Sequence, residues 1–204
     1  MLHIDIGRCP VTTAAAATVA EVLRRPGNVA VVPTETVYGL ISRVTDEGSE
    51  RIYALKRRSG SKRLGWFVGD WRLLERYGVA LTPAVCRLAE RFMPGPLTVI
   101  APTADGGSIG FRMPDHPFLS ALLTEMGEPL LQTSANLSGA PDSLTLEDAL
   151  EGLDGAVEAA VDGGTLPPGS LASTVVDVVT ETPRILRQGA LKLDLRDFMP
   201  GADL

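Results

Sequence analysis

The sequence predicts an α/β fold in which helices flank one twisted sheet of mixed parallel and antiparallel strands. Two observations support this prediction. The chain has 204 residues and is 45% hydrophobic, which is enough to bury one large core. Apolar runs typical of strands occur in pairs as often as they alternate with helical segments, and this order favours a mixed sheet over a strictly parallel one. We therefore expect a single domain over residues 1–204.

The expected helices start at capping residues or prolines and show apolar positions at helical spacing. Thr12 or Thr13 can cap an Ala-rich segment that Pro26 and Gly27 end, and Ser49 can cap the next helix. The expected helices are 12–25, 49–58, 82–92, 116–126 and 146–153. The expected strands are short apolar runs bounded by turn residues, at 28–33, 64–68, 97–101, 108–113, 129–136, 156–164, 173–179 and 183–189.

Composition and missing motifs exclude several classes of protein. An isoelectric point near 5.0 argues against a surface built to coat nucleic acid. Cys9 and Cys86 have neither CxxC nor Cys/His metal spacing, so we expect reduced thiols and a cytoplasmic protein. Asp5 interrupts the apolar run that a signal peptide needs, and no run approaches the roughly 18 residues of a membrane span. The motifs GxxxxGK[ST], GxGxxG, HExxH and GxSxG are also absent.

Several expected strands end in small polar residues, at the edge where open α/β sheets tend to bind ligands. The hydroxyl and amide groups there belong to Thr34, Thr36, Ser134, Asn136, Ser173 and Thr174, and the accompanying cations are Lys56, Arg58, Arg112 and Arg187. This combination suits polyanions and favours phosphoryl or nucleotidyl transfer, which depends mainly on positioning and charge neutralisation. Structural interpretations stay open. The hydroxyls can serve turns, Arg112 can be an exposed edge charge, and Arg187 can pair with Asp177 or Glu181.

The segment from Lys56 to Arg63 reverses the charge of the chain locally. Five of its eight positions are cationic, whereas the formal net charge of the protein is −6. One interpretation is a solvated helix end whose cations interact with the helix dipole. The other is a phosphate-binding site. Charges at a helix end contribute little to stability, so we expect Lys56→Ala and Arg58→Ala to impair phosphate binding without unfolding the domain.

Seven ordered segments together resemble the YrdC-like family, whose members include threonylcarbamoyl-AMP synthases. The segments are PTETVYGL, ALKRRSGSK, RFMPGPLTVI, GFRMPDHP, TSANLSGAP, STVVD and PRILRQGA, and the resemblance is strongest over residues 28–190. It implies a single YrdC-like domain with a concave central site. It also implies the first step of tRNA threonylcarbamoyladenosine (t6A) modification. In that step L-threonine, bicarbonate and ATP give threonylcarbamoyl-AMP and pyrophosphate, with Mg²⁺ accompanying ATP.

The resemblance also implies roles for individual residues. Lys56 and Arg58 would be catalytic, and together with Lys62 they match the family's basic segment that lies against the ATP phosphates. Further ATP contacts are implied for Ser134, Asn136 and Arg187. Contacts with L-threonine are implied for Thr34 or Thr36, Arg112 and Ser173. A site that recognises a substrate hydroxyl can reject amino acids that lack it. No metal ligand is implied.

The segments depart from the family pattern at three positions. Ser59 and Arg63 stand where the basic segment has prolines, and Asp142 stands where a serine is usual. A carboxylate near phosphates repels them unless it holds magnesium or points away. The alternative hypothesis is therefore a noncatalytic YrdC-like module that binds RNA or a nucleotide. The chain resembles the short family form, which implies that a separate tRNA threonylcarbamoyl-transfer complex receives the product.

Overall fold

Ten strands form one sheet in the part of the chain that a computed structural model describes, residues 1–7, 12–60 and 63–194. The strands are β1 Leu2–Asp5, β2 Val29–Val32, β3 Gly39–Arg43, β4 Gly65–Phe67, β5 Leu97–Pro102, β6 Ser108–Arg112, β7 Leu130–Ser134, β8 Ala159–Asp162, β9 Thr174–Asp177 and β10 Arg184–Arg187. The helices are α1 Thr12–Leu23, α2 Asp46–Leu55, α3 Pro83–Phe92, α4 Pro117–Met126 and α5 Leu146–Glu151, with a 3₁₀ helix η1 at Trp71–Tyr77. The strand order is β1-β8-β2-β3-β7-β4-β6-β5-β9-β10.

Parallel and antiparallel pairs both occur in this sheet, which confirms the predicted fold class. β8 is parallel to β1 and β2, β6 is parallel to β4, and β9 is parallel to β5. β3 is antiparallel to both β2 and β7. The three-residue strand β4 is short, yet it joins β7 on one side to β6 on the other. The sheet is therefore narrow at β4.

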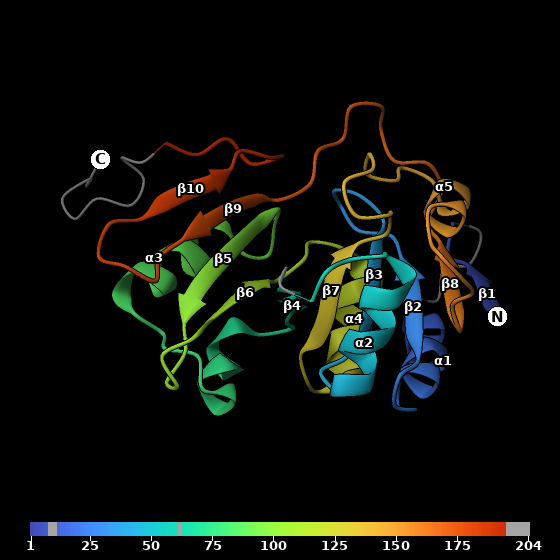
Figure 1. Ribbon diagram of the computed structural model, residues 1–204, viewed down its shortest axis with the longest axis horizontal. Helices are drawn as coiled ribbons and strands as arrows, with labels where there is room; N and C mark the ends of the chain where they lie inside the picture. The colour runs from blue at the N-terminus through green and yellow to red at the C-terminus, as the bar shows by residue number, and fades with distance from the viewer. Residues whose placement is uncertain (8–11, 61–62, 195–204) are drawn as a thin grey trace.

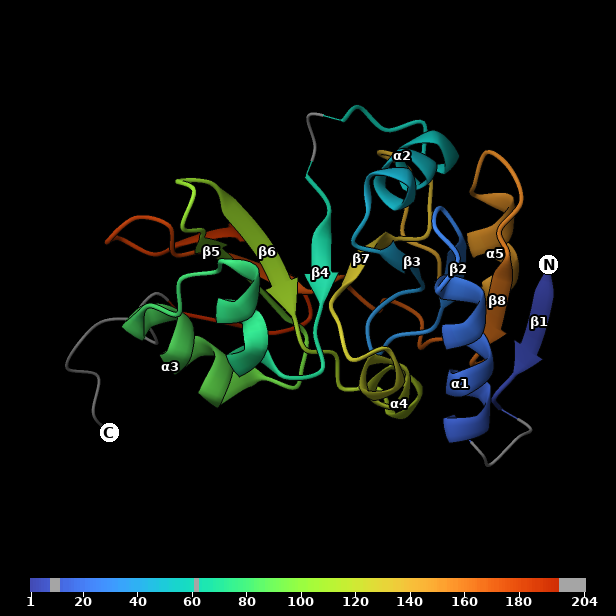
Figure 2. The same cartoon turned by 90° about the horizontal axis from the view of Figure 1, so that it is seen from below.

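The sheet has two halves that meet at β4 (Figures 1 and 2). In the half that contains β7, α1 and α4 pack on one face of the sheet, while α2 and α5 pack on the other. In the half that contains β5 and β9, α3 and η1 pack on a separate apolar core. Strands from both halves therefore border the space beside β4.

Most of the expected elements are observed, but two strands were not expected. Thr82 caps α3 as predicted, because its Oγ1 accepts a hydrogen bond from the N–H of Val85 at 3.3 Å. β3 was missed because only Leu40 and Ile41 are apolar between its glycine and its polar end, which is too short a run for a strand signal. β1 was missed because it has only four residues and forms by pairing with β8, which is far away in the sequence.

The start and end of α2 differ from the prediction. Thr45 is the N-cap, because its Oγ1 accepts a hydrogen bond from the N–H of Gly48 at 3.1 Å. Ser49 lies inside the helix, where its hydroxyl donates to the carbonyl of Asp46 at 2.8 Å. The helix ends at Leu55, and Arg57 follows with a φ of 46° in the left-handed region. The basic segment therefore leaves the helix instead of continuing it.

The described residues contain few features outside this α/β architecture. Within them, no helix combines the length and the apolar character needed to cross a membrane, and no cluster of His, Cys, Asp and Glu could hold a metal ion. Cys86 is a free thiol, and burial raises its pKa, so it is not activated as a nucleophile. Cys9 lies outside the described residues.

Thr45→Ala should destabilise the protein by about 1 kcal/mol, because it removes the acceptor for the N–H of Gly48 at the start of α2. Ser49→Ala is the matched control and should change the free energy of unfolding by less than about 0.5 kcal/mol. Urea denaturation of the two variants measures the difference. Equal losses at both positions would contradict a helix that starts after Thr45.

Candidate functional site

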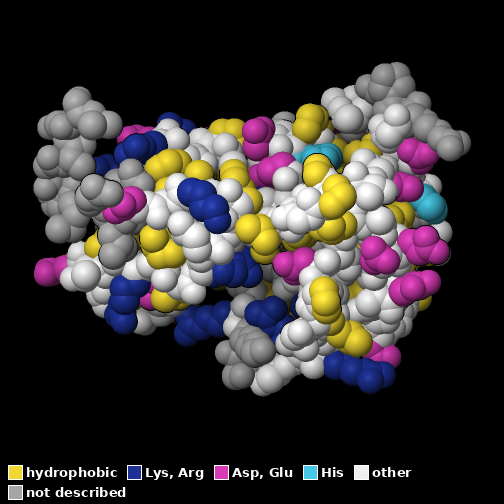
Figure 3. Space-filling model, turned by 90° about the horizontal axis from the view of Figure 1, so that it is seen from above, with side chains coloured by type: hydrophobic (Ala, Val, Ile, Leu, Met, Phe, Trp, Pro, Cys, Tyr) yellow, Lys and Arg dark blue, Asp and Glu magenta, His cyan; other side chains and the backbone are white. Residues whose placement is uncertain are grey.

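A cavity of about 390 Å³ lies beside β4, between the two halves of the sheet. Four arginines line it, Arg58, Arg63, Arg112 and Arg187, and its lining within the described residues contains no Asp or Glu. Figure 3 shows Lys and Arg side chains gathered around a hollow near the middle of one face. Because the protein as a whole carries a net charge of −6, this local positive charge favours an anionic ligand.

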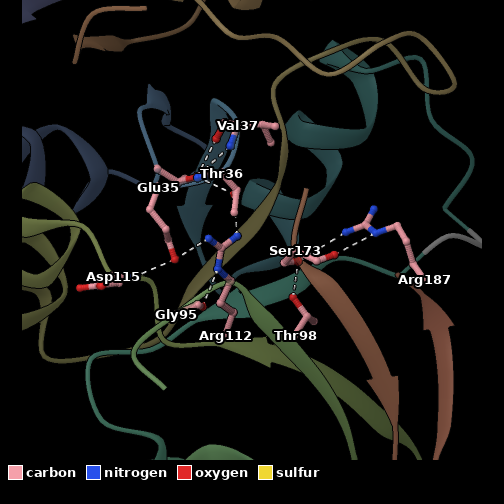
Figure 4. Close-up of polar contacts among 10 residues, drawn as sticks. Glu35, Thr36, Val37, Gly95, Thr98, Arg112, Asp115, Ser173 and Arg187 are labelled. Atoms are coloured by element: carbon pink, nitrogen blue, oxygen red, sulfur yellow. Dashed lines mark hydrogen bonds and ion pairs between the residues drawn. The ribbon is translucent and has the colours of Figure 1, made fainter. Parts of the chain in front are cut away.

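The turn between β2 and β3 forms one wall of the cavity. Thr34 organises the turn, since its Oγ1 accepts hydrogen bonds from the N–H groups of Thr36 at 3.0 Å and Val37 at 3.2 Å. The hydroxyl of Thr36 reaches the cavity lining and accepts a hydrogen bond from Nη1 of Arg112 at 3.0 Å (Figure 4). Thr34 therefore shapes the turn, whereas Thr36 is the threonine placed to contact a ligand.

Arg112 is buried, so its interpretation as an exposed edge charge is wrong. Its side chain is 5% exposed, and its Nε donates to the carbonyl of Gly95 at 3.2 Å. Its Nη2 forms an ion pair with Oε1 of Glu35 at 2.7 Å, and that oxygen also accepts the N–H of Asp115 at 3.0 Å (Figure 4). The sequence analysis missed Glu35 because a single carboxylate in a turn carries no signal. The ion pair fixes the orientation of Arg112 at one end of the cavity.

Ser173 lies on another part of the wall, between Thr98 and Arg187 (Figure 4). Its Oγ is 2.8 Å from Oγ1 of Thr98, and its carbonyl accepts a hydrogen bond from Nε of Arg187 at 3.0 Å. Arg187 thus contacts Ser173 and not the two carboxylates considered from the sequence. Thr174 is not part of the cavity lining, because its hydroxyl donates to the carbonyl of Leu191 on the far side of the strand.

Lys56 is buried, with an exposed fraction of 1%. Its Nζ donates to the carbonyls of Ser134 and Asn136 and to Oδ1 of Asn136 at 3.2 Å. These bonds, which we call the Lys56 bridge, join the end of α2 to the end of β7 and use all three donors of the ammonium group. The solvated helix-end interpretation is therefore wrong for Lys56. The helix-end interpretation does fit the exposed Arg57, whose Nε forms an ion pair with Oδ2 of Asp154 at 2.7 Å.

The charge of Lys56 depends on its surroundings. Burial lowers the pKa of Lys56 to about 8, and the positive charge of Arg58 adds to this decrease. The carboxylate of Asp142 acts in the opposite direction and raises the pKa of Lys56. Asp142 therefore supports a positive charge on Lys56, behind the Ser134 wall of the candidate site. Its neighbour Ser143 is buried and donates to the carbonyl of Ala135 at 2.8 Å, which is a structural role.

Arg58 and Arg63 lie next to each other on the cavity wall. Nη1 of Arg58 donates to Oγ1 of Thr133 at 3.0 Å, and its Nη2 donates to the carbonyl of Arg63 at 2.9 Å. Nη1 of Arg63 in turn donates to the carbonyl of Ser108 at 2.6 Å. Burial lowers the pKa of Arg58, but a guanidinium stays charged at neutral pH. Lys62, which the resemblance places against phosphates, lies outside the described residues.

The predicted site residues divide into a lining and a supporting layer. The residues that line the cavity are Arg58, Ser134, Arg187, Thr36, Arg112 and Ser173. Lys56, Asn136 and Thr34 are not in the lining but bond to residues that are. Asn136 accepts a hydrogen bond from Oγ of Ser134 at 2.5 Å and donates through Nδ2 to the carbonyl of Ala140 at 2.6 Å. The structure thus brings these predicted residues together around one cavity, and it separates them into two layers that the sequence did not distinguish.

Residues 22–189 match the model of the Sua5/YciO/YrdC family, which carries the description "Telomere recombination". The chain belongs to this family. A Bacillus subtilis threonylcarbamoyl-AMP synthase is 36% identical over 183 residues, which are 84% of this chain and 53% of that protein. A Pyrococcus abyssi threonylcarbamoyl-AMP synthase is 33% identical over 180 residues, which are 83% of this chain and 53% of that protein. The chain therefore spans about half the length of these curated relatives.

Solved structures of the family have the same fold as this chain. Pyrococcus abyssi Sua5 in complex with L-threonine superposes with a TM-score of 0.83 at 30% identity, over 94% of this chain and 58% of that one. Escherichia coli YciO superposes with a TM-score of 0.81 at 25% identity, over 97% of this chain and 98% of that one. These similarities confirm the α/β fold predicted from the seven sequence segments.

Lys56→Ala should lower the free energy of unfolding by about 3 kcal/mol, because two buried carbonyls and the Asn136 side-chain oxygen lose their donor. This expectation reverses the one drawn from the sequence. Arg57→Ala, next in the chain, removes only a surface ion pair and should change stability by less than about 1 kcal/mol. Chemical denaturation compares the two variants, and a fully stable Lys56→Ala protein would rule out a structural role for the bridge.

Proposed function

We propose that this chain is a threonylcarbamoyl-AMP synthase, which joins L-threonine, bicarbonate and the AMP part of ATP and releases pyrophosphate. The observation that carries the proposal is the cavity beside β4. There the hydroxyls of Thr36, Ser134 and Ser173 lie among four arginines, and no carboxylate lines the cavity within the described residues. Relatives named threonylcarbamoyl-AMP synthase, and a Sua5 structure that contains L-threonine, support the same activity.

The proposed reaction needs positioning and charge neutralisation more than acid–base catalysis. The amine of threonine attacks the carbon of bicarbonate, and water leaves, which gives a carbamate. An oxygen of the carbamate then attacks the α-phosphorus of ATP. The bond from that phosphorus to the bridging oxygen breaks, and pyrophosphate leaves with the electron pair. A preorganised set of cations and hydroxyls is suited to such a transfer.

We place the amino acid at the Arg112 end of the cavity. A carboxylate needs a fixed cation, and Arg112 is held by Glu35, Thr36 and Gly95. The hydroxyls of Thr36 and Ser173 both line the cavity and can accept or donate hydrogen bonds to a substrate hydroxyl. This arrangement gives threonine an advantage over amino acids that lack a hydroxyl.

We place the ATP phosphates at Arg58, Arg63 and Ser134. The two guanidinium groups are preorganised by hydrogen bonds to neutral oxygens, and the Ser134 hydroxyl lies on the same wall. Lys56 contributes positive charge from behind this wall and holds Ser134 in place through the Lys56 bridge. In this proposal Arg58 contacts the phosphates as a catalytic residue, whereas Lys56 is a positioning residue. In the same proposal Arg187, which also lines the cavity, contacts the nucleotide.

Mg²⁺ fits this site as a companion of ATP. The cavity lining within the described residues has no carboxylate, and the described chain has no cluster of metal ligands. Mg²⁺ commonly keeps several waters and binds through substrate phosphates, so the ATP itself can supply its ligands. When bound, the ion would neutralise charge on the phosphates. The product would pass to a separate complex that transfers the threonylcarbamoyl group to tRNA.

Pyrophosphate release from ATP, in the presence of Mg²⁺ and bicarbonate, should require L-threonine and should be much slower with L-valine, which has the shape of threonine but no hydroxyl. Arg58→Ala should reduce the rate at least about tenfold, because it removes a cation from the developing charge. Arg57→Ala, which lies outside the cavity, is the matched control and should retain the wild-type rate. ATP binding without pyrophosphate release under any amino acid would instead support a noncatalytic nucleotide-binding module.

ATP affinity should fall as the pH rises through about 8, because Lys56 then loses the positive charge that lies behind the phosphate wall. Below this pH the ammonium group is charged and attracts the phosphates. Titration calorimetry on both sides of pH 8 measures the change, with Lys56→Met as the comparison. The variant should bind ATP more weakly at the lower pH and show no decrease through this range. An equal pH dependence in both proteins would assign the effect to another group.

A further inference from the structure

Gln132 is a polar side chain of the cavity lining to which the proposed reaction assigns no role. The other polar side chains in the described lining are hydrogen-bonded within the protein, as shown by Thr98 with Ser173 and by Arg63 with Ser108. Among the described residues, the amide of Gln132 has no hydrogen-bond partner. Its oxygen acceptor and its two N–H donors are therefore available to a ligand.

Gln132 stands at one end of a row that crosses four strands. Strand pairing places Gln132 on β7 beside Gly65 on β4, and Gly110 on β6 beside Ile100 on β5. The pairing of β4 with β6 puts the two glycines next to each other, and all four residues line the cavity. Because strands lie about 4.8 Å apart, about 14 Å separates the backbones of Gln132 and Ile100, and the two glycines between them contribute no side chain of their own. We call Gly65 and Gly110 the glycine floor.

The amide of Gln132 lies over this floor. A Cβ atom added to Gly65 would be 2.6 Å from Nε2 of Gln132 and 3.2 Å from the carbonyl oxygen of Gly110. Any side chain at position 65 would therefore displace the amide. A Cβ atom at Gly110 would meet only methyl and methylene groups, of Thr98 at 3.5 Å and Ile100 at 3.7 Å. The space above Gly110 is thus bounded by apolar carbons on one side and by the glutamine amide on the other.

Two of the four cavity arginines, Arg112 and Arg187, occupy a different row of the same sheet face. Arg112 lies two residues beyond Gly110 on β6, and Thr98 lies two residues from Ile100 on β5, so each pair shares a face. Thr98 pairs with Val175, which pairs with Arg187. The row with Arg112 and Arg187 is therefore cationic, whereas the row with the glycine floor is neutral. The two rows are about 7 Å apart along the strands.

A nucleotide has an anionic part, which the proposed function places at Arg58 and Arg63, and a neutral base, which suits the uncharged floor beside these two arginines. A purine ring is flat and can lie on a surface without side chains, and its edge presents one donor and one acceptor side by side. A glutamine amide pairs with such an edge through two hydrogen bonds, as it does with the adenine N6 and N7 atoms in DNA recognition. The side chain of threonine is too small to need a floor two strands wide.

We propose that Gln132 determines the base specificity of this site by hydrogen-bonding the edge of an adenine ring that lies above Gly110 of the glycine floor. The inference rests on the proposed function, since it concerns the ATP of that reaction. Oε1 of Gln132 accepts from the exocyclic amino group, and Nε2 donates to an adjacent ring nitrogen. The base thereby fixes the nucleotide relative to Arg58 and Arg63, which lie beside Thr133 and Ser108 at the border of the floor.

The test compares the binding of ATP with that of purine riboside 5′-triphosphate, which lacks the 6-amino group. The wild-type protein should bind ATP at least about tenfold more tightly, because the analogue loses one of the two hydrogen bonds and leaves Oε1 of Gln132 without a donor. In Gln132→Leu the two dissociation constants should become equal within a factor of about two. Gln132→Met keeps the length of the side chain and serves as a second variant if the leucine protein does not fold. Gln188→Leu, at the other glutamine of the chain, should retain the wild-type preference.

The outcomes separate this inference from the function on which it rests. A wild-type preference for ATP that persists in Gln132→Leu or Gln132→Met overturns the role of Gln132, while the proposed function stands. A wild-type protein that binds both nucleotides equally tightly also overturns the role of Gln132 and leaves the proposed function standing. A variant that changes only the KM for threonine assigns Gln132 to the amino acid and also overturns the inference. Failure of the wild-type protein to bind ATP at all removes the proposed function itself.

Discussion

The buried ammonium group of Lys56 is the interaction on which the candidate site depends. Removing a charge from water is unfavourable, so a buried lysine persists only where acceptors replace its hydration. Here the acceptors are the carbonyls of Ser134 and Asn136 and the side chain of Asn136. These groups come from a segment about 80 residues further along the chain, just after β7. The bridge therefore sets how the basic segment and the Ser134 turn face each other.

The short strand β4 explains the position of the cavity. A longer strand here would extend the sheet into the space that the cavity occupies between the two halves. Instead β4 has three residues, so the ends of β7, β6 and β9 border one space, and loops from both halves reach it. Groups that are remote in the sequence meet there, such as Thr36 in the turn between β2 and β3 and Arg112 at the end of β6. The site is thus a property of the mixed topology and not of a single motif.

The sequence predicted the elements with local signals and missed those set by distant contacts. Thr82 and the following proline specify the start of α3 wherever the chain packs, and the structure confirms it. The burial of Lys56 could not be predicted in this way, because its acceptors are known only once β7 lies beside α2. Glu35 was missed for the same reason, since its partner Arg112 lies 77 residues away in the sequence. The resemblance named candidate site residues, but it could not show which of them line the cavity and which support the lining.

The ion pair between Arg112 and Glu35 divides the cavity into two electrostatically different ends. Glu35 offsets much of the charge of Arg112, and Oε2 of Glu35 is buried without a hydrogen-bond partner among the described residues, so this carboxylate depends on that arginine. At the other end Arg58 and Arg63 lie next to each other and donate to the neutral oxygens of Thr133, Arg63 and Ser108. In the proposed function a polyphosphate would bind most strongly at the Arg58 end, where two guanidinium groups are adjacent, and a single carboxylate would bind at the Arg112 end. This asymmetry would give an amino acid and a nucleotide separate places within one continuous cavity.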